Sequence, residues 1–414
     1  MTDSERPNIV LVTIDSLRAD HCGCYGYDRD TTPTLDEMAA DGVQFENAIA
    51  PGPATPESMP VIFTGEWPVH RNVDGDSELV QRRERIRSHM EARYTLPERM
   101  RDLGYETAAF TPNPFMSRHF GFDQGFDHFQ DFMDEANRGS MYDKVFQGFL
   151  DGSGVSSLAR VFLNFWQREE VFKPWESYYD DVVEWTEDTD ESYFLWVFLM
   201  DAHNPYMASA EYRTQSRLQA LHANFEFWRQ DHETPFSESI HEKLLTAYDD
   251  SIRYSDAFLK RLRDDLAADD PVIAVHGDHG EAFGEHGTYG HEPYLHEENV
   301  RVPLVIDGVE HDHVEQPVSL RDLPEALTTL ASRGEVEFPP GDLAVAQTRD
   351  GDAVSAWTPG ETHRTALRAA GSRGPSDRET PDAIEHLVER LRVGGQEREA
   401  IVSGARDALD GRQL

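Results

Sequence analysis

The chain of 414 residues contains few lysines and few cysteines, and it has a large deficit of positive charge. Lysine occurs only at positions 144, 173, 243 and 260, so arginine supplies nearly all of the positive charge. Against 38 basic residues stand 78 acidic ones, which gives a formal net charge of −40. Because the phosphate backbone of nucleic acid binds to a basic surface, we expect no nucleic-acid partner.

The acidic residues are spread along the whole chain rather than collected in a tail. A dispersed acidic surface with little lysine is typical of proteins kept soluble at very high salt. At roughly 1 M salt a screening length near 3 Å suppresses the repulsion between like charges. The composition therefore predicts a halophilic protein, and an ordinary acidic protein is the alternative.

Long apolar runs are also missing, so we expect no membrane span. The first seven residues are polar and acidic and lack the basic and apolar regions of a signal peptide, which predicts a cytoplasmic protein. Cys22 and Cys24 are the only cysteines. Their spacing is poor for a mutual disulfide and no second pair could complete a zinc knuckle, so we expect thiols that are buried or in a loop.

What the sequence does contain is a set of apolar runs that end in polar residues. The clearest run is 272–275, which continues into His276, Gly277, Asp278 and His279. This pattern is typical of a buried strand of a parallel sheet, and ligands in open α/β sheets bind beyond the carboxyl ends of such strands. A polar turn after a strand is the alternative.

The same pattern recurs elsewhere in the chain. Asp15 follows the apolar run 8–14, Asn113 follows the run 105–110, and His203 follows the run 193–200. Helical patterns separate these runs, which predicts an α/β fold with a mostly parallel central sheet sandwiched by helices. Because parallel strands place their carboxyl ends on one edge, we expect these polar residues to gather there.

The domain organisation follows from composition. We predict one large domain over residues 1–333, with helical insertions at about 115–190, rich in aromatic residues, and at 207–240. Residues 70–95 are charged and are predicted to be irregular. A small C-terminal region at 334–414 is poor in apolar residues and is expected to be partly disordered.

Several short motifs occur in order along the chain. They include Asp15-Ser16-Leu17-Arg18, Thr32-Pro33-Thr34-Leu35, Asp278-His279-Gly280-Glu281 and Arg301-Val302-Pro303-Leu304. Together these motifs resemble the sulfatase family of the alkaline phosphatase superfamily. Their order and spacing match over roughly the first 330 residues, and the C-terminal part matches little. The resemblance implies a sulfatase-like catalytic domain that acts on an anionic ester.

The resemblance also implies one divalent metal ion, held by Asp15, Asp278 and His279 together with Thr55. Many sulfatases carry two adjacent aspartates after the first strand, whereas the second of these places is Ser16 here. Since an imidazole joins the site, manganese or zinc is favoured, while calcium or magnesium stays open. Taken alone, Asp15 could equally be a turn or capping residue.

Thr55 stands where the family places its nucleophile, which is formylglycine, Ser or Thr. Formylglycine formation needs Cys or Ser at this position and Arg at the fifth, but this chain has Thr55 and Met59. We therefore predict no formylglycine and a metal-bound Thr55 as the nucleophile. Taken alone, a threonine before a proline is an ordinary helix cap, and the two interpretations are compatible.

Other polar residues complete the predicted site. His203 and His291 would neutralise the leaving oxygen, and Asn113 and Arg18 would bind the substrate anion, unless Arg18 instead forms an ion pair with Asp20. Exposed loop residues are the alternative for both histidines and for Asn113. The nearby histidines expected to be structural or to lie behind the ligands are His276, His286 and His296.

These features predict a metal-dependent hydrolase of sulfate or phosphate esters of small molecules, glycans or lipids. A threonine nucleophile makes phosphodiester or phosphonate hydrolysis chemically more natural, as it does phospho-alcohol transfer to a glycan or lipid. A protein of another class, which binds an anionic glycan without catalysis, is the alternative. The sequence leaves the physiological substrate and the oligomeric state open.

Overall fold

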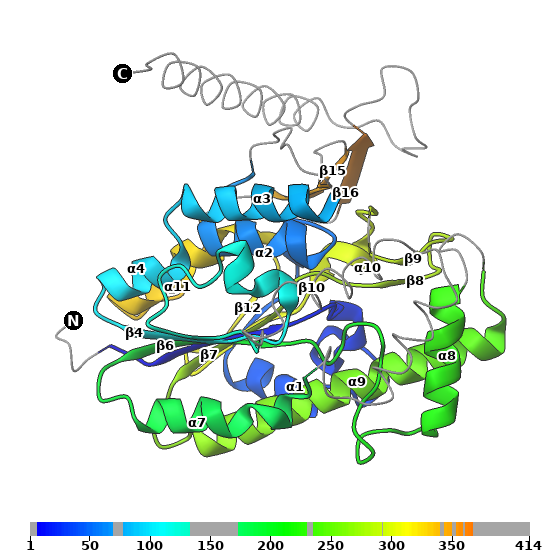
Figure 1. The fold of residues 1–414 in the computed structure, drawn as a ribbon, viewed down its shortest axis with the longest axis horizontal. Helices are drawn as coiled ribbons and strands as arrows, with labels where there is room; N and C mark the ends of the chain where they lie inside the picture. Colours follow the sequence, from blue (N-terminus) through cyan, green and yellow to red (C-terminus); the bar gives the residue numbers. More distant parts are fainter. Residues whose placement is uncertain are drawn as a thin grey trace.

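The computed structural model describes residues 6–68, 78–132, 173–229, 235–291, 293–339, 343–349, 353–358 and 361–366. Over these residues an eight-stranded sheet lies between two layers of helices, as Figure 1 shows. The predicted α/β class with a mostly parallel central sheet is confirmed. No helix in these ranges is both long enough and apolar enough to cross a membrane.

The strand order of the large sheet is β12-β2-β11-β7-β1-β6-β4-β5. Its central strand β1 (Ile9–Ile14) pairs in parallel with β6 (Tyr193–Leu199) on one side and with β7 (Val272–Gly277) on the other. β4 (Glu106–Phe110) and β5 (His128–Gln130) extend the parallel part. The parallel register places the carboxyl ends of β1, β4, β6 and β7 on one edge.

Beyond β7, strand β11 (Leu304–Asp307) runs antiparallel to both of its neighbours. β2 (Val43–Phe45) and β12 (Asp312–Val314) then complete the sheet. The short strands of the smaller sheets are β3 (Ala48–Ile49), β8 (Ala282–Phe283), β9 (Tyr289–Gly290), β10 (Arg301–Val302), β13 (Val318–Ser319), β14 (Ala344–Gln347), β15 (Ala353–Thr358) and β16 (Glu361–Ala366).

The alternation of side chains along β1 explains why its sequence is apolar except at Thr13. Ile9 and Leu11 face one core, shared with the helices α2 (Thr55–Thr64), α3 (Glu78–Glu91), α4 (Leu96–Asp102) and α11 (Leu323–Arg333). Val10 and Val12 face the opposite core, shared with α1 (Pro33–Asp41), α7 (Tyr179–Glu187) and α9 (Glu238–Asp265). A strand covered on both faces has no polar side.

The prediction of an irregular segment at 70–95 is wrong over α3. Leu79, Ile86 and Met90 lie on one side of this helix and are buried in the core. Arg82 is also buried and lies 3.6 Å from the Glu57 carboxylate of α2. The apolar stripe is narrow because these three residues are separated by charged ones, so the high charge of the segment concealed its helical period.

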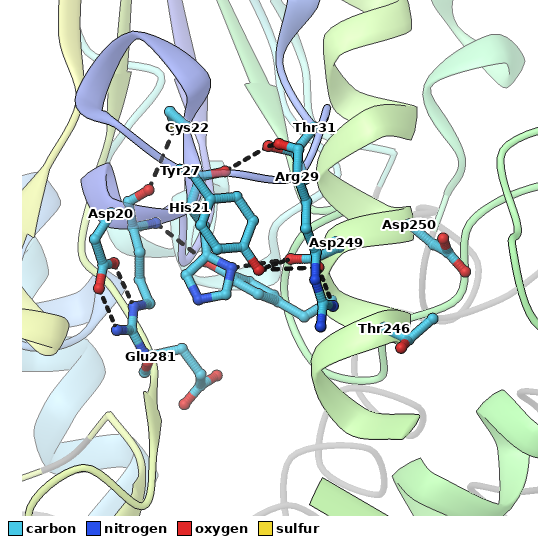
Figure 2. A network of polar contacts seen from close by, with 12 residues as sticks. Asp20, His21, Cys22, Tyr27, Arg29, Thr31, Thr246, Asp249, Asp250 and Glu281 are labelled. Atoms are coloured by element: carbon cyan, nitrogen blue, oxygen red, sulfur yellow. Dashed lines mark hydrogen bonds and ion pairs between the residues drawn. The ribbon is translucent and has the colours of Figure 1, made fainter. Parts of the chain in front are cut away.

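A buried carboxylate of α9, Asp249, binds three side chains of the long loop after β1 (Figure 2). The hydroxyl of Tyr27 donates to both Asp249 oxygens at 3.0 and 3.1 Å, and Arg29 donates at 2.7 Å. His21 Nδ1 lies 2.9 Å from the same carboxylate. Neighbouring Cys22 is buried, and both Cys22 and Cys24 are free thiols, as predicted.

The predicted insertions and C-terminal region are described in part. Residues 133–172 of the first insertion, 230–234 of the second and 367–414 lie outside the described ranges. The described parts include α7 and α8 (Arg217–Arg229). Three residues after position 333 join the same apolar core as α2 and α11, namely Ala344, Ala346 and Trp357.

Candidate metal and nucleophile site

Four predicted site residues meet at the carboxyl edge of the sheet. Asp15 directly follows β1, Asp278 and His279 follow β7, and Thr55 is the first residue of α2. The His279 Nε2 atom lies 3.2 Å from Thr55 Oγ1, 3.4 Å from Asp15 Oδ1 and 3.6 Å from Asp278 Oδ2. All four side chains are buried. Residues more than 200 positions apart therefore share one small volume.

Ser16, the departure from the two-aspartate pattern, joins the two carboxylates. Its backbone N–H donates to Asp278 Oδ1 at 3.1 Å, and its hydroxyl donates to Asp15 Oδ1 at 3.0 Å. Its carbonyl accepts from the Tyr248 hydroxyl at 2.6 Å. Ser16 has a φ of 60°, in the left-handed region that residues other than glycine rarely adopt. This turn aims its N–H and its hydroxyl at different strand ends.

The donor atoms fit a divalent cation. Asp278 Oδ2 is buried and has no hydrogen-bond partner, which is costly unless another group binds there. His279 Nδ1 donates to the Gly280 carbonyl at 2.9 Å, so its Nε2 is the nitrogen that can bind a metal once its proton has left. Ligands about 2 Å from a tetrahedral ion lie about 3.3 Å apart, close to the distances found here. Two carboxylates, one imidazole and one hydroxyl suit zinc or manganese better than calcium.

Burial and the neighbouring charges shift the pKa values of the cluster in different directions. Burial raises the pKa of Asp278 to about 7. Burial disfavours the imidazolium of His279, but the carboxylates of Asp278 and Asp15 outweigh this and raise its pKa to about 10. For Asp15, burial opposes ionisation, yet His203 and His279 together lower its pKa. The cluster thus stabilises positive charge at the point where the four side chains meet.

His203 and His291 lie on the more exposed side of this cluster. The His291 ring centroid is 4.7 Å from that of His279 and 5.7 Å from that of His203. His203 Nδ1 donates to the Asn204 carbonyl at 2.5 Å, and His291 Nδ1 lies 3.1 Å from Glu281 Oε1. Both rings are partly exposed, whereas the four side chains of the cluster are buried. With Nδ1 engaged in each ring, Nε2 is the nitrogen left for a bound molecule: it accepts a hydrogen bond in the neutral ring and donates one in the imidazolium.

Glu281 has a role that the sequence did not reveal, although it stands in the Asp278 motif. One of its oxygens holds His291, and the other accepts from the Tyr206 hydroxyl at 3.0 Å. The side chain is fully buried. Burial opposes its ionisation, but His291 and His203 outweigh this and lower its pKa. The carboxylate therefore orients His291, and its place three residues after Asp278 was the available signal.

Asn113 and Arg18, the predicted anion-binding residues, bind other parts of the protein. The Asn113 amide donates to Asp15 Oδ2 at 3.0 Å, and its oxygen accepts from the Phe115 N–H at 2.9 Å. The buried Arg18 guanidinium pairs with Asp20 at 2.6 Å and with Glu285 at 2.5 Å. For Arg18 the ion pair with Asp20, which was the alternative interpretation, is what the structure contains.

The site and the fold match a known family. A family model described as Sulfatase matches residues 7–332, which is most of the chain. The chain belongs to the sulfatase family. Among sulfatase relatives, an uncharacterised sulfatase, YidJ of Escherichia coli, is 22% identical over 83% of this chain and 72% of its own length. An N-acetylglucosamine-6-O-sulfatase of Bacteroides thetaiotaomicron is 27% identical over 35% of this chain, and human arylsulfatase A is 41% identical over 15%. The matched parts span only 24% and 12% of those two relatives.

Solved structures share the sulfatase fold at low identity. BT1596, a 2-O GAG sulfatase, superposes with a TM-score of 0.61 and 16% identity over 99% of this chain and 94% of its own. A phosphonate monoester hydrolase of Agrobacterium radiobacter superposes with a TM-score of 0.58 and 16% identity over 97% and 96% of the two chains. The same fold therefore occurs both in a sulfatase and in a phosphonate monoester hydrolase.

Proposed function

We propose that this sulfatase-family chain is a metal-dependent hydrolase of sulfate or phosphate esters that uses Thr55 as its nucleophile. The observation that carries the proposal is the position of the Thr55 hydroxyl. It lies 3.2 Å from His279 Nε2, beside the partnerless Asp278 Oδ2 and at the first residue of α2. No side chain caps α2. Helix capping therefore does not explain why the Thr55 hydroxyl lies beside two carboxylates and an imidazole.

The residue at position 59 supports a nucleophile that is not formylglycine. Met59 is fully buried in the apolar core beneath α2. The arginine that formylglycine formation requires at this position would place a charge among apolar side chains. Thr55 also lacks the Cys or Ser from which the aldehyde is made. We therefore propose attack by the unmodified threonine hydroxyl.

In the proposed reaction, Asp15, Asp278, His279 and Thr55 would hold the divalent ion. The ion would supply positive charge that favours the ionised form of the Thr55 hydroxyl and attracts the substrate anion. The positive end of α2 adds to this attraction, because Thr55 opens a helix of ten residues. Asn113 and Ser16 keep the Asp15 carboxylate in place through their hydrogen bonds.

The covalent chemistry uses residues of the chain. The Thr55 oxygen attacks phosphorus or sulfur, and the bond to the leaving alkoxide breaks. His203 or His291, in its imidazolium form, protonates this alkoxide from Nε2, the ring nitrogen away from its backbone or carboxylate partner, and becomes neutral. Water, deprotonated by the same histidine, then cleaves the ester of Thr55. We expect attack at phosphorus rather than at sulfur. Water can hydrolyse the phosphate ester of threonine, so no aldehyde is needed to expel the product.

Two alternatives share this site. A sugar or lipid alcohol in place of water would make the protein a phospho-alcohol transferase. Without turnover, the same cluster would serve a protein that binds an anionic glycan. The relative named as an N-acetylglucosamine-6-O-sulfatase makes sulfated amino sugars the first natural esters to test on the sulfate side.

The test is a panel of esters with the purified full chain in high salt. Nitrophenyl sulfate, nitrophenyl phosphate, bis-nitrophenyl phosphate and a sulfated glucosamine are each assayed with manganese, with zinc and with chelator. Thr55→Ala is expected to lower turnover by about three orders of magnitude or more. Thr55→Ser retains the hydroxyl and is expected to keep part of the activity.

A matched control is Thr64→Ala in the same helix. Thr64 donates to the Pro60 carbonyl at 2.7 Å and lies 2.9 Å from His89 Nε2, so its loss is expected to lower stability and leave turnover intact. Turnover that survives in Thr55→Ala would refute the proposed nucleophile. Equal turnover of sulfate and diester would refute the preference for phosphorus, and binding without any turnover would favour the glycan-binding alternative.

A further inference from the structure

A second group of metal-ligand side chains lies outside the site described above. His286 follows β8, and His296 and Glu298 lie at the start of α10 (Glu297–Val300). Each offers a ligand atom, and these atoms all lie within 4.8 Å of one another. In the described part of the chain, this group and the Asp15 cluster are the two sets of three such residues that are close enough to hold an ion.

The geometry of this group suits a small cation. His286 Nδ1 lies 3.8 Å from Glu298 Oε1, which is too long for a hydrogen bond. Two ligands of one tetrahedral zinc ion lie about 3.3 Å apart, close to that distance. The His286 and His296 rings are 4.0 Å apart between centroids and nearly perpendicular, at 80°.

Glu298 supplies the independent sign of a ligand. Its side chain is only 6% exposed, and its Oε1 atom is buried without a hydrogen-bond partner. A buried carboxylate oxygen without a hydrogen bond costs free energy, and an ion between it and the two imidazoles would remove that cost. The nearby Arg18 does not fill this place, because its guanidinium is held by Asp20 and Glu285.

We propose that His286, His296 and Glu298 form a second zinc site. Two imidazoles and one carboxylate are a common zinc ligand set, and water completes the coordination. The His286 side chain is 42% exposed, so the ion can enter from solvent on that side. The site shares no residue with the Asp15 cluster, and it stands whether or not Thr55 is the nucleophile.

The proposed ion would fix the segment that carries His291. This residue lies between His286 and His296 in the chain, so an ion bound to both closes the intervening loop. The far side of the site is already rigid, because the Gly280 N–H donates to the Asn299 carbonyl at 2.7 Å. A Cβ atom at Gly280 would lie 2.1 Å from the Glu298 carbonyl, so Glu298 packs directly against the loop of Asp278 and His279.

The experiment counts zinc ions bound to the full chain after chelation and reconstitution with zinc alone, at fixed high salt. The wild type is expected to bind two ions per chain, and the double variant Asp15→Asn/Asp278→Asn is expected to bind one. In that double variant, adding His286→Gln or Glu298→Gln is expected to abolish the remaining ion. Cobalt in place of zinc reports the same site by its visible absorption.

A matched control is His222→Gln in the Asp15→Asn/Asp278→Asn background. The pair His222 and Glu226 has the same separation of 3.8 Å and an exposed imidazole, but it belongs to no group of three ligands in the described ranges. This change is expected to leave the ion bound. Circular dichroism checks that each variant is folded, and exposed His286 is the substitution least disturbing to the fold. The proposal is overturned if Asp15→Asn/Asp278→Asn binds no zinc, or if its ion survives both His286→Gln and Glu298→Gln.

Discussion

Two buried aspartates, Asp249 and Asp278, show what separates a structural carboxylate from one built to bind an additional group. Both are at most 1% exposed. Asp249 has both of its oxygens occupied, by Tyr27, Arg29 and His21 (Figure 2). Asp278 has only one oxygen occupied, by the N–H groups of Ser16 and His279, and its Oδ2 has no hydrogen-bond partner.

The difference shows that burial alone does not mark a functional group. A buried charge whose hydrogen bonds are complete holds segments together, as Asp249 holds the loop after β1 to α9. A buried carboxylate oxygen without a hydrogen bond needs a partner from outside the chain. By this criterion Asp278 belongs to a binding site, and Asp249 belongs to the scaffold that supports it.

The largest expected effect comes from the same substitution at the two positions. Asp249→Asn breaks a buried charge network and is expected to lower the free energy of unfolding by about 3 kcal/mol. Asp278→Asn removes a carboxylate whose burial is only partly offset by His279, so the metal-free chain is expected to change by less than about 1 kcal/mol, while turnover and metal binding at the Asp15 cluster are lost. Urea unfolding with chelator in constant high salt measures both. Equal destabilisation by the two changes would contradict the distinction drawn here.

A smaller effect is expected from His276, a buried histidine whose hydrogen bonds are complete. The Trp196 N–H donates to Thr13 Oγ1 at 3.0 Å, the Thr13 hydroxyl lies 2.9 Å from His276 Nε2, and His276 Nδ1 lies 2.9 Å from the Gly277 carbonyl. This chain of donors leaves Nε2 as an acceptor with no room for a second proton. Burial accordingly lowers the pKa of His276 to about 4.

Because the pKa of His276 is lower in the folded protein than in the unfolded chain, this residue binds a proton more tightly when the chain is unfolded. The neutral buried ring therefore contributes its full stabilisation above about pH 6.5, and this contribution is lost as the pH falls through 6.5 towards 4. Wild type is expected to lose about 2 kcal/mol from this residue between pH 7 and pH 5. His276→Asn is expected to be less stable at pH 7 but to show a smaller loss over that interval. An unchanged loss in urea unfolding at the two pH values would contradict the assignment.

The smallest expected effect comes from Glu281, which holds His291 beside the cluster. Glu281→Gln is expected to lower kcat by about tenfold and to leave KM and metal content nearly unchanged, because the change affects only the orientation of His291. Tyr206→Phe removes the other hydrogen bond of Glu281 and keeps its charge, so a smaller loss is expected. A loss of bound metal in Glu281→Gln would show that the carboxylate supports the ion instead.

The parts of the fold that follow from local patterns were predictable. The continuous apolar runs predicted central strands covered on both faces, and the polar residue after each run predicted the edge where the site lies. The prediction failed at α3, where only three apolar residues, separated by charged ones, are buried in the core. It also left Glu281 without a role, since nothing local indicates that its two oxygens bind His291 and Tyr206.

The sequence by itself determined which chemical groups reach the edge of the sheet, and it determined that position 55 is threonine with methionine at position 59. Only the tertiary structure decided how these groups pair. Ser16 joins Asp15 to Asp278, and Asn113 binds Asp15 through its amide. Such pairings depend on the direction of each hydrogen bond. They also depend on a strand register that relates residues about 260 positions apart. No local stretch of residues encodes either of these.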